Sequence, residues 1–147
     1  MSNGETLLYA PTQDERTLAL LAHLLQIISG WLGPLIILLI KRESKFVSFH
    51  ALQALLLQVA HLVLMVVLGF CAFFMFFLFA MIPSSHVPSP FPILIVPMFF
   101  LAWLGPWITI VVLGILYGMR ASQGEWAEYP VLGTLAKKFL HIGKTPG

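Results

Sequence analysis

The chain has 147 residues, 59% of them hydrophobic and only 10% charged, and its mean hydropathy is +0.94. Soluble domains carry about 25% charged residues, so this composition excludes an ordinary water-soluble globular protein. The formal net charge of +2 is too small to indicate nucleic acid as a partner. We expect an all-α integral membrane protein that forms one small helical bundle in the lipid bilayer.

The first expected helix follows a polar N-terminal tail, residues 1–13. Thr12 and Glu15 have the spacing of a capping box, in which each side chain accepts from the other residue's backbone N–H group. The apolar run 18–40 comes next and ends at a basic turn, residues 41–45. Because this run is long enough to cross the hydrocarbon core, we expect it to be the first membrane span.

The second expected helix, residues 46–82, is longer than one crossing requires. It contains no proline and would measure roughly 55 Å, against about 30 Å for the hydrocarbon core. Residues 62–82 carry no charged, amide or hydroxyl side chain, so we place the second span at about 58–82. The first part, 46–61, has a polar stripe and is expected to be an amphipathic extension that lies at the interface or packs against other helices.

The third expected span, at about 93–118, follows a proline-rich and uncharged connection, residues 83–92. The three spans would form one transmembrane domain, residues 14–120. The remaining tail, 121–147, is expected to be cytoplasmic. Within this tail the apolar residues of 131–142 recur at helical spacing, which predicts a short helix lying on the membrane surface.

Orientation follows from the basic residues near the ends of the spans. The turn 41–45, Arg120 and the tail that follows it hold seven of the eight Lys and Arg residues, Arg16 precedes the first span, and the connection 83–92 has none. Three spans would therefore leave the N-terminus outside and the C-terminus in the cytoplasm of a multi-pass protein, which we expect in a bacterial inner membrane. Trp126 and Tyr129 would lie in the headgroup layer.

A short repeat places Gly and Pro inside two expected spans. Trp31-Leu32-Gly33-Pro34 recurs as Trp103-Leu104-Gly105-Pro106. The simpler interpretation is that Gly33, Pro34, Gly105 and Pro106 kink the helices and let their neighbours approach closely. Alternatively, broken helices mark a translocation pathway, because freed carbonyl groups can line a polar cavity.

Six polar side chains fall within or beside the apolar segments, and such groups are functional candidates by default. They are His23 and Gln26 on the first helix and His50, Gln53, Gln58 and His61 on the second. Their two stripes could meet, with hydrogen bonds of roughly 0.5–2 kcal/mol each holding the helices together. The alternative is that they line a pathway through the membrane.

A haem or metal site is a further interpretation of the histidines, since imidazole is a suitable ligand. His50 and His61 would lie about 16 Å apart along a helix, too far for one metal ion, so only His23 with one of them could form a pair. The spans contain no carboxylate, so the acid–base pairs of an enzyme are missing. We therefore predict no catalytic, cofactor-binding or metal-binding residues.

Several short phrases also occur together, in one order, in a known group of proteins. They are Arg16 to His23 (RTLALLAH), Gly33-Pro34 before a basic turn, Phe46-Val47, Phe49-His50-Ala51, Gln53-Ala54-Leu55, Gly124-Glu125-Trp126 and Tyr129-Pro130. Over about residues 14–140 the chain resembles small bacterial membrane proteins of unknown function grouped with the twenty-kilodalton subunit of the chloroplast inner-envelope import apparatus (Tic-twenty-like). The resemblance implies an all-helical membrane protein with cytoplasmic basic loops. The chloroplast relative, thought to help form a preprotein channel, has four spans, whereas three are expected here.

Together these features predict a non-enzymatic integral membrane protein that assembles with itself or with a partner protein in the membrane. Two alternatives stay open: a small transporter or protein-translocation channel subunit, and a haem-binding membrane subunit. The sequence gives neither a substrate nor the identity of a partner.

Overall fold

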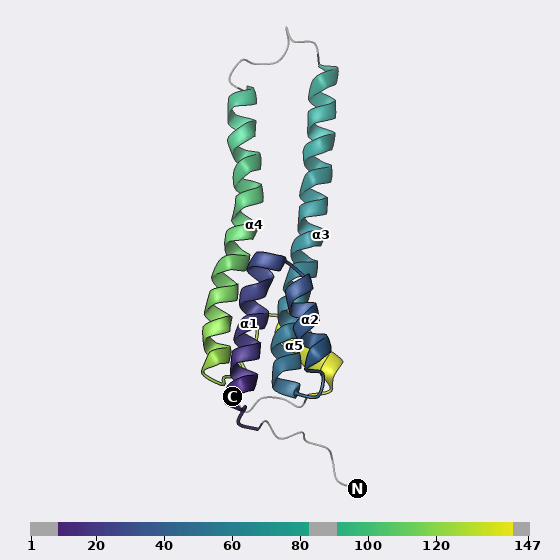
Figure 1. The fold of residues 1–147 in the computed structure, drawn as a ribbon. Helices are drawn as coiled ribbons and strands as arrows, with labels where there is room; N and C mark the ends of the chain where they lie inside the picture. Colours follow the sequence, from purple (N-terminus) through teal and green to yellow (C-terminus); the bar gives the residue numbers. More distant parts are fainter. Residues whose placement is uncertain (1–8, 83–90, 143–147) are drawn as a thin grey trace. The chain divides into compact units, whose positions relative to one another are not determined.

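The computed structural model describes residues 9–82 and 91–142, apart from the side chains of residues 80 and 91–95. Within these residues the elements are all α-helices (Figure 1), so the predicted all-α class is confirmed. The helices are α1 (Gln13–Ser29), α2 (Leu32–Ile40), α3 (Lys45–Met81), α4 (Phe91–Ser122) and α5 (Leu132–Leu140). The expected connection and both chain ends lie largely outside the described residues.

The chain divides into two compact units, which are described separately. One comprises residues up to 59 and from 110 onward, and we call it the five-helix unit because it holds all or part of every helix. The other comprises residues 60–109, and we call it the apolar unit. It holds the later part of α3 and the earlier part of α4.

Helix α1 begins where its capping box predicts. The Thr12 hydroxyl accepts from the Glu15 backbone N–H at 3.3 Å, and the Glu15 carboxylate accepts from the Thr12 N–H at 2.8 Å. Two of the four unpaired N–H groups that every helix start exposes are thus satisfied by local side chains.

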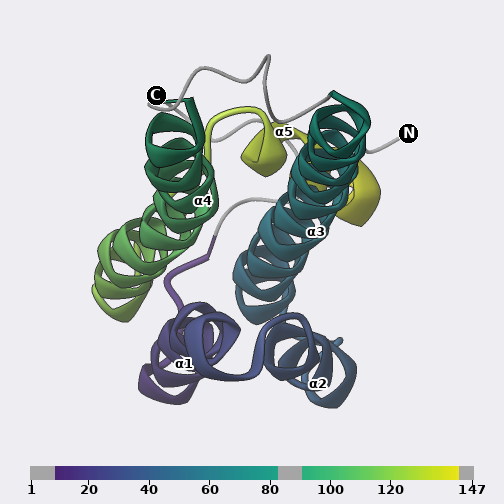
Figure 2. The ribbon, with the colours of Figure 1, turned by 90° about the horizontal axis from the view of Figure 1, so that it is seen from above.

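The apolar run 18–40 forms two helices rather than the single span expected from its length. The chain turns at Gly30–Trp31, and α2 runs back beside α1 (Figures 1 and 2). Gly30 has φ +60°, which glycine adopts without steric cost. A Cβ atom on Gly33 would lie only 2.4 Å from the Leu25 Cβ, so glycine also permits the close approach of the two helices.

Two helices of the described chain are long and apolar enough to cross a membrane, with candidate spans Lys45–Phe79 and Val96–Ser122. They overlap the second and third predicted spans. Helices α1 and α2 have 17 and 9 residues, roughly 25 Å and 14 Å, and each falls short of the hydrocarbon thickness. The expected crossing at 18–40 is therefore not confirmed, because a hairpin occupies that run.

The two Gly-Pro pairs have different surroundings. Gly33 and Pro34 lie in the first turn of α2. The N–H groups of a first turn have no acceptor within the helix, so the N–H group that proline lacks costs the helix no hydrogen bond. Gly105 and Pro106 lie inside α4, which continues as one helix through Pro106. The chain breaks at Gly30, ahead of the first pair.

The early part of α3 is buried inside the five-helix unit. Phe46, Val47, Phe49 and Ala51 have no exposed surface. Small residues on neighbouring helices pack against them. Ala19 and Ala121 pack with Phe46, and Ala22 packs with Val47. Of the two roles predicted for the amphipathic extension, packing against other helices is the one observed.

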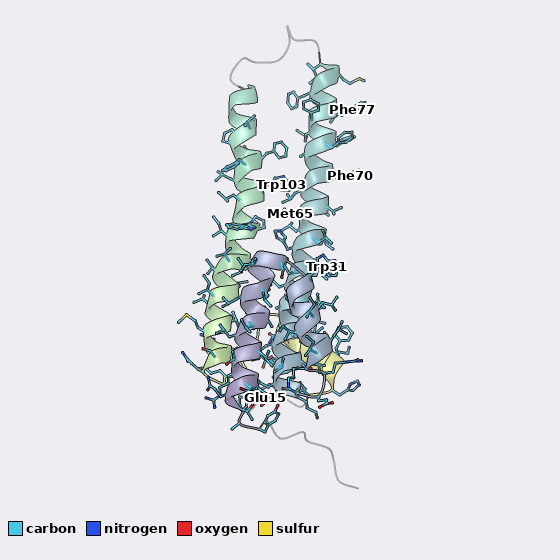
Figure 3. All side chains as sticks on the ribbon, in the orientation of Figure 1. Glu15, Trp31, Met65, Phe70, Phe77 and Trp103 are labelled. Carbon is cyan, nitrogen blue, oxygen red and sulfur yellow. The ribbon has the colours of Figure 1, made fainter. Side chains whose placement is uncertain are left out.

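The apolar unit presents its side chains outward. Phe70, Phe73 and Phe76 on α3 are 74%, 68% and 74% exposed, and Figure 3 labels Phe70 and Phe77 on this part of the helix. Residues 60–82 would measure roughly 34 Å, close to the hydrocarbon thickness. A continuous apolar surface of this size is typical of a segment that lies in lipid.

Candidate functional site

A cluster of polar side chains is buried at the centre of the five-helix unit, and we call it the polar cluster. Each member is at most 2% exposed. The members are His23 and Gln26 from α1, His50 and Gln53 from α3, and Tyr129 from the segment before α5. Helices far apart in the sequence therefore place their polar stripes against one another.

The segment between α4 and α5 explains why α3 carries polar residues. Residues 123–131 are not helical, so their backbone groups lack the partners that a helix supplies. The Gln53 side chain accepts from the Tyr129 backbone N–H at 2.6 Å and donates to the Ala127 carbonyl at 3.2 Å. Irregular backbone is tolerated in an apolar environment only when its polar groups are paired, and Gln53 pairs two of them.

A chain of hydrogen bonds runs through the cluster, and its direction follows from the acceptor at one end. His50 Nε2 lies 3.0 Å from the Glu125 carbonyl oxygen, which can only accept, so this nitrogen carries a proton. The Nδ1 atom of a neutral His50 then accepts from His23 Nε2 at 3.1 Å. His23 Nδ1 accepts in turn from the Tyr129 hydroxyl at 2.9 Å, and the Gln26 amide donates to the Tyr129 oxygen at 3.2 Å.

The chemistry of Tyr129 fits its place in this chain. Burial raises the pKa of the Tyr129 hydroxyl above its ordinary value, and the neighbouring Tyr117 acts in the same direction, although the bond from Gln26 lowers it. The hydroxyl therefore stays protonated and remains a donor to His23. Tyr129, which is expected in the headgroup layer, is buried inside the protein, where Gln53 binds its backbone N–H and His23 binds its hydroxyl.

Helix α4 packs against the cluster through two glycines, which are not among the predicted site residues. A Cβ atom on Gly114 would lie 2.9 Å from Gln26 Nε2, and one on Gly118 would lie 3.3 Å from the His23 Cβ. Their spacing is that of the Gly-x-x-x-Gly motif, which lets helices in membranes pack closely. This spacing was the sequence signal that could have located the α1–α4 contact.

The remaining polar candidates lie apart from the cluster. The Gln58 amide donates to the Gln26 backbone carbonyl at 2.7 Å and so ties α3 to α1 near the hairpin turn. His61 belongs to the apolar unit, where it lines an open groove of about 470 Å³ with Met65, Trp103 and Trp107. Trp126 packs on Phe46 with ring centroids 5.1 Å apart, partly shielded from solvent.

The two buried histidines contact each other directly through their ring nitrogens. His23 Nε2 and His50 Nδ1 are 3.1 Å apart. Within the part of the chain that the structure describes, no group of three or more His, Cys, Asp or Glu residues could hold a metal ion.

A second polar group lies where α1, α2 and α3 meet. The Glu15 carboxylate accepts from the Ser44 hydroxyl at 2.7 Å and from the Tyr9 hydroxyl. Partial burial would raise the pKa of Glu15, but the hydrogen bonds from Tyr9, Ser44 and Thr12 outweigh it and lower the pKa to about 2. These contacts fix the start of α1 beside the start of α3, at the end of the unit where Lys41 and its basic neighbours lie.

These features define a small α-helical membrane protein in which buried polar groups bind one another and the backbone, while Gln26 Oε1 has no hydrogen-bond partner among the described residues. The family model described as the magnetosome magnetite crystal formation protein family (MamF/MmsF) matches residues 14–136, and the chain belongs to this family. Its members are proteins of the magnetosome membrane that take part in magnetite crystal formation. Comparisons with curated proteins and with solved structures gave no match.

The family match corrects the resemblance to Tic-twenty-like proteins, which was wrong. The phrases behind that resemblance are short and mostly apolar or aromatic, and membrane helices draw on few residue types, so similar phrases recur in unrelated chains. The support that this resemblance gave to a protein-translocation channel is lost with it.

Proposed function

We propose that this protein contributes to magnetite crystal formation as a non-enzymatic scaffold of the magnetosome membrane. The proposal rests on the hydrogen-bond chain of the polar cluster. Both ring nitrogens of His23 and His50 are used within the protein, and the Tyr129 hydroxyl is used as well. These groups stabilise a shape and are not presented to a substrate.

The α1–α2 hairpin supports a topology with two crossings. If the hairpin enters and leaves on one face, only α3 and α4 cross, and residues 9 and 142 lie on the same side. The seven Lys and Arg residues within 9–142 then lie on that side, and the sequence 83–90 has none. Because basic residues favour the cytoplasm, residues 9 and 142 are both cytoplasmic. This arrangement replaces the one with the N-terminus outside.

The topology limits how the protein can affect the mineral. By its sequence, the connection 83–90 (PSSHVPSP) offers no carboxylate to the far side of the membrane. Carboxylate oxygens are the usual protein ligands of hard metal cations. The protein therefore acts through the membrane and through the proteins it assembles with, itself or others, and not as a carboxylate surface for the crystal.

Complementation tests this proposal in a magnetosome-forming bacterium that lacks its own copy of the gene. Gln53→Leu breaks the scaffold, and it is expected to reduce crystal size toward that of the deletion strain in electron micrographs. The double variant Asp14→Asn, Glu43→Gln removes exposed carboxylates and is expected to give crystals of wild-type size. Deletion-like crystals from the carboxylate variant, at normal levels in the membrane, would contradict the scaffold role.

A further inference from the structure

We propose that the apolar unit binds one phospholipid in the groove between α3 and α4. An acyl chain of the lipid lies along the groove, and its ester or phosphate oxygens accept hydrogen bonds from His61 and Trp107. The assignment to the cytoplasmic leaflet rests on the topology in the proposed function. The site itself depends neither on that topology nor on a role in crystal formation.

His61 is the polar candidate whose side chain the protein itself leaves without a partner. The other five candidates each make a hydrogen bond inside the protein, and they are His23, Gln26, His50, Gln53 and Gln58. His61 makes none with the described residues. A polar group without a partner is costly in an apolar environment, so a partner from outside the chain is expected.

The groove beside His61 is apolar and uncharged. Its volume of about 470 Å³ is within the range of ligand sites, about 300–1,000 Å³. The lining residues are His61 and Met65 from α3 and Phe100, Trp103, Leu104 and Trp107 from α4. Figure 3 labels Trp103 and Met65, which extend toward each other between the two helices. An apolar wall of this kind suits an acyl chain, and since it carries no charge, it should not select for a charged headgroup.

The groove begins at an edge of the apolar segment and covers most of one leaflet. His61 is the last polar side chain before the apolar residues 62–82. A Cβ atom on Gly69 would lie 3.9 Å from the Trp103 ring, so this ring is level with a point roughly 12 Å along α3 from His61. Half of the hydrocarbon core is about 15 Å. Trp107 lies one turn further along α4, toward the five-helix unit, and His61 lies at that same end of the apolar unit.

The N–H groups at this end of the groove require an acceptor. The indole N–H of Trp107 can only donate, and a neutral histidine ring donates one N–H in either tautomer. The Trp107 indole, like the His61 ring, has no hydrogen-bond partner among the described residues. Tryptophan side chains collect at the edge of the hydrocarbon layer, where the ester and phosphate oxygens of phospholipids are the available acceptors.

A second copy of the chain is less suited to the groove than a lipid, because its spans lack matching acceptors. Residues 62–82 have no polar side chain, and residues 96–108 add only the N–H donors of two tryptophans. The backbone carbonyls of the two helices bond within them, apart from those that face the prolines of α4. A phospholipid brings both the apolar chain and the oxygen acceptors.

Native mass spectrometry of the full-length protein tests the site. The protein is released from mixed micelles that contain equal amounts of phosphatidylethanolamine and phosphatidylglycerol. One phospholipid per chain is expected to remain after the detergent is stripped, with the two headgroups retained to a similar extent. No retained lipid, retention of the anionic lipid alone, or a lipid-free dimer, which would assign the groove to a second copy, would overturn the site. Crystal size would still decide the scaffold proposal.

Variants and a photoreactive lipid assign the retained molecule to the groove. His61→Leu with Trp107→Phe removes both N–H groups but keeps the groove apolar, so several-fold less lipid should be retained. Trp31→Phe changes a tryptophan outside the groove that is 50% exposed, and it should retain lipid as the wild type does. In the wild type, a phosphatidylcholine with a diazirine on its acyl chain should label groove residues such as Met65 after free lipid is removed. Label mainly on residues 18–40, or full retention by the double variant, would refute the proposal.

Discussion

His50 ends the hydrogen-bond chain at a backbone carbonyl, and this one acceptor sets the proton positions along the chain as far as Tyr129. The carbonyl belongs to Glu125, in a segment that sequence patterns did not place in the core. The polar stripe on α3 could be predicted from its spacing, but its partners could not. Those partners are backbone atoms of the tail, and residue types carry no signal for a backbone acceptor.

The amide of Gln53 provides a test at this scale. Gln53→Leu leaves the buried Tyr129 N–H and the part-buried Ala127 carbonyl without the Gln53 partner, and an unpaired buried group costs about 1–3 kcal/mol. We expect a loss of about 3 kcal/mol in the free energy of unfolding in detergent, measured by chemical denaturation. Gln58→Leu is the matched control and should cost about 1 kcal/mol, because it removes one hydrogen bond and not two. Equal losses would show that Gln53 does not hold the tail.

The pKa of Glu15 gives a prediction for acid stability. A carboxyl group whose pKa is lowered to about 2 in the folded state stabilises the protein above its ordinary pKa, and this contribution disappears as the pH falls toward 2. The melting temperature of the wild type should therefore fall between about pH 4.5 and pH 2, and that of Glu15→Gln should fall less. Asp14→Asn is the control and should follow the wild type. If the melting temperature of Glu15→Gln fell with pH as steeply as that of the wild type, the lowered pKa of Glu15 would be contradicted.

At the scale of the helices, local sequence signals predict the helices correctly, whereas the length of an apolar run does not predict how many helices it forms. The start of α1 and the continuity of α3 follow from a capping box and from the absence of proline, which act within a few residues. The sequence did not reveal the hairpin because 23 apolar residues suit one crossing as well as two short packed helices, and hydropathy does not distinguish the two. Gly30 was the informative residue, since glycine is the residue that reverses a chain at positive φ most easily.

The packing of α4 against α1 is tested by comparing two glycines of the same helix. Gly114→Ala places a Cβ atom 2.9 Å from the Gln26 side chain and 3.1 Å from the His23 carbonyl, so the helices must move apart. We expect a destabilisation of about 1–3 kcal/mol. Gly105→Ala meets nothing within 4 Å and should be neutral or stabilising by up to about 1 kcal/mol. The two variants should therefore change the melting temperature in opposite directions or by clearly different amounts. Similar melting temperatures would argue against the α1–α4 contact.

At the scale of the whole molecule, the sequence predicts a membrane protein with its basic residues gathered toward one side. The number of crossings decides where the first residues lie. Three crossings would separate Arg16 from the other basic residues, whereas two crossings and a hairpin bring all of them to one face. The second arrangement agrees better with the charge pattern, although the hairpin could not be found from that pattern alone.

The position of Gln13 relative to Glu43 tests this account most directly. Single cysteines at Gln13, Glu43 and Ser85, each in a Cys71→Ser background, are treated in spheroplasts with a maleimide that cannot cross the membrane. Two crossings predict that only the Ser85 cysteine reacts before the membrane is opened, and that the other two react together afterwards. A Gln13 cysteine that reacts in closed spheroplasts, while the Glu43 cysteine does not, would contradict the hairpin and restore a first crossing at 18–40.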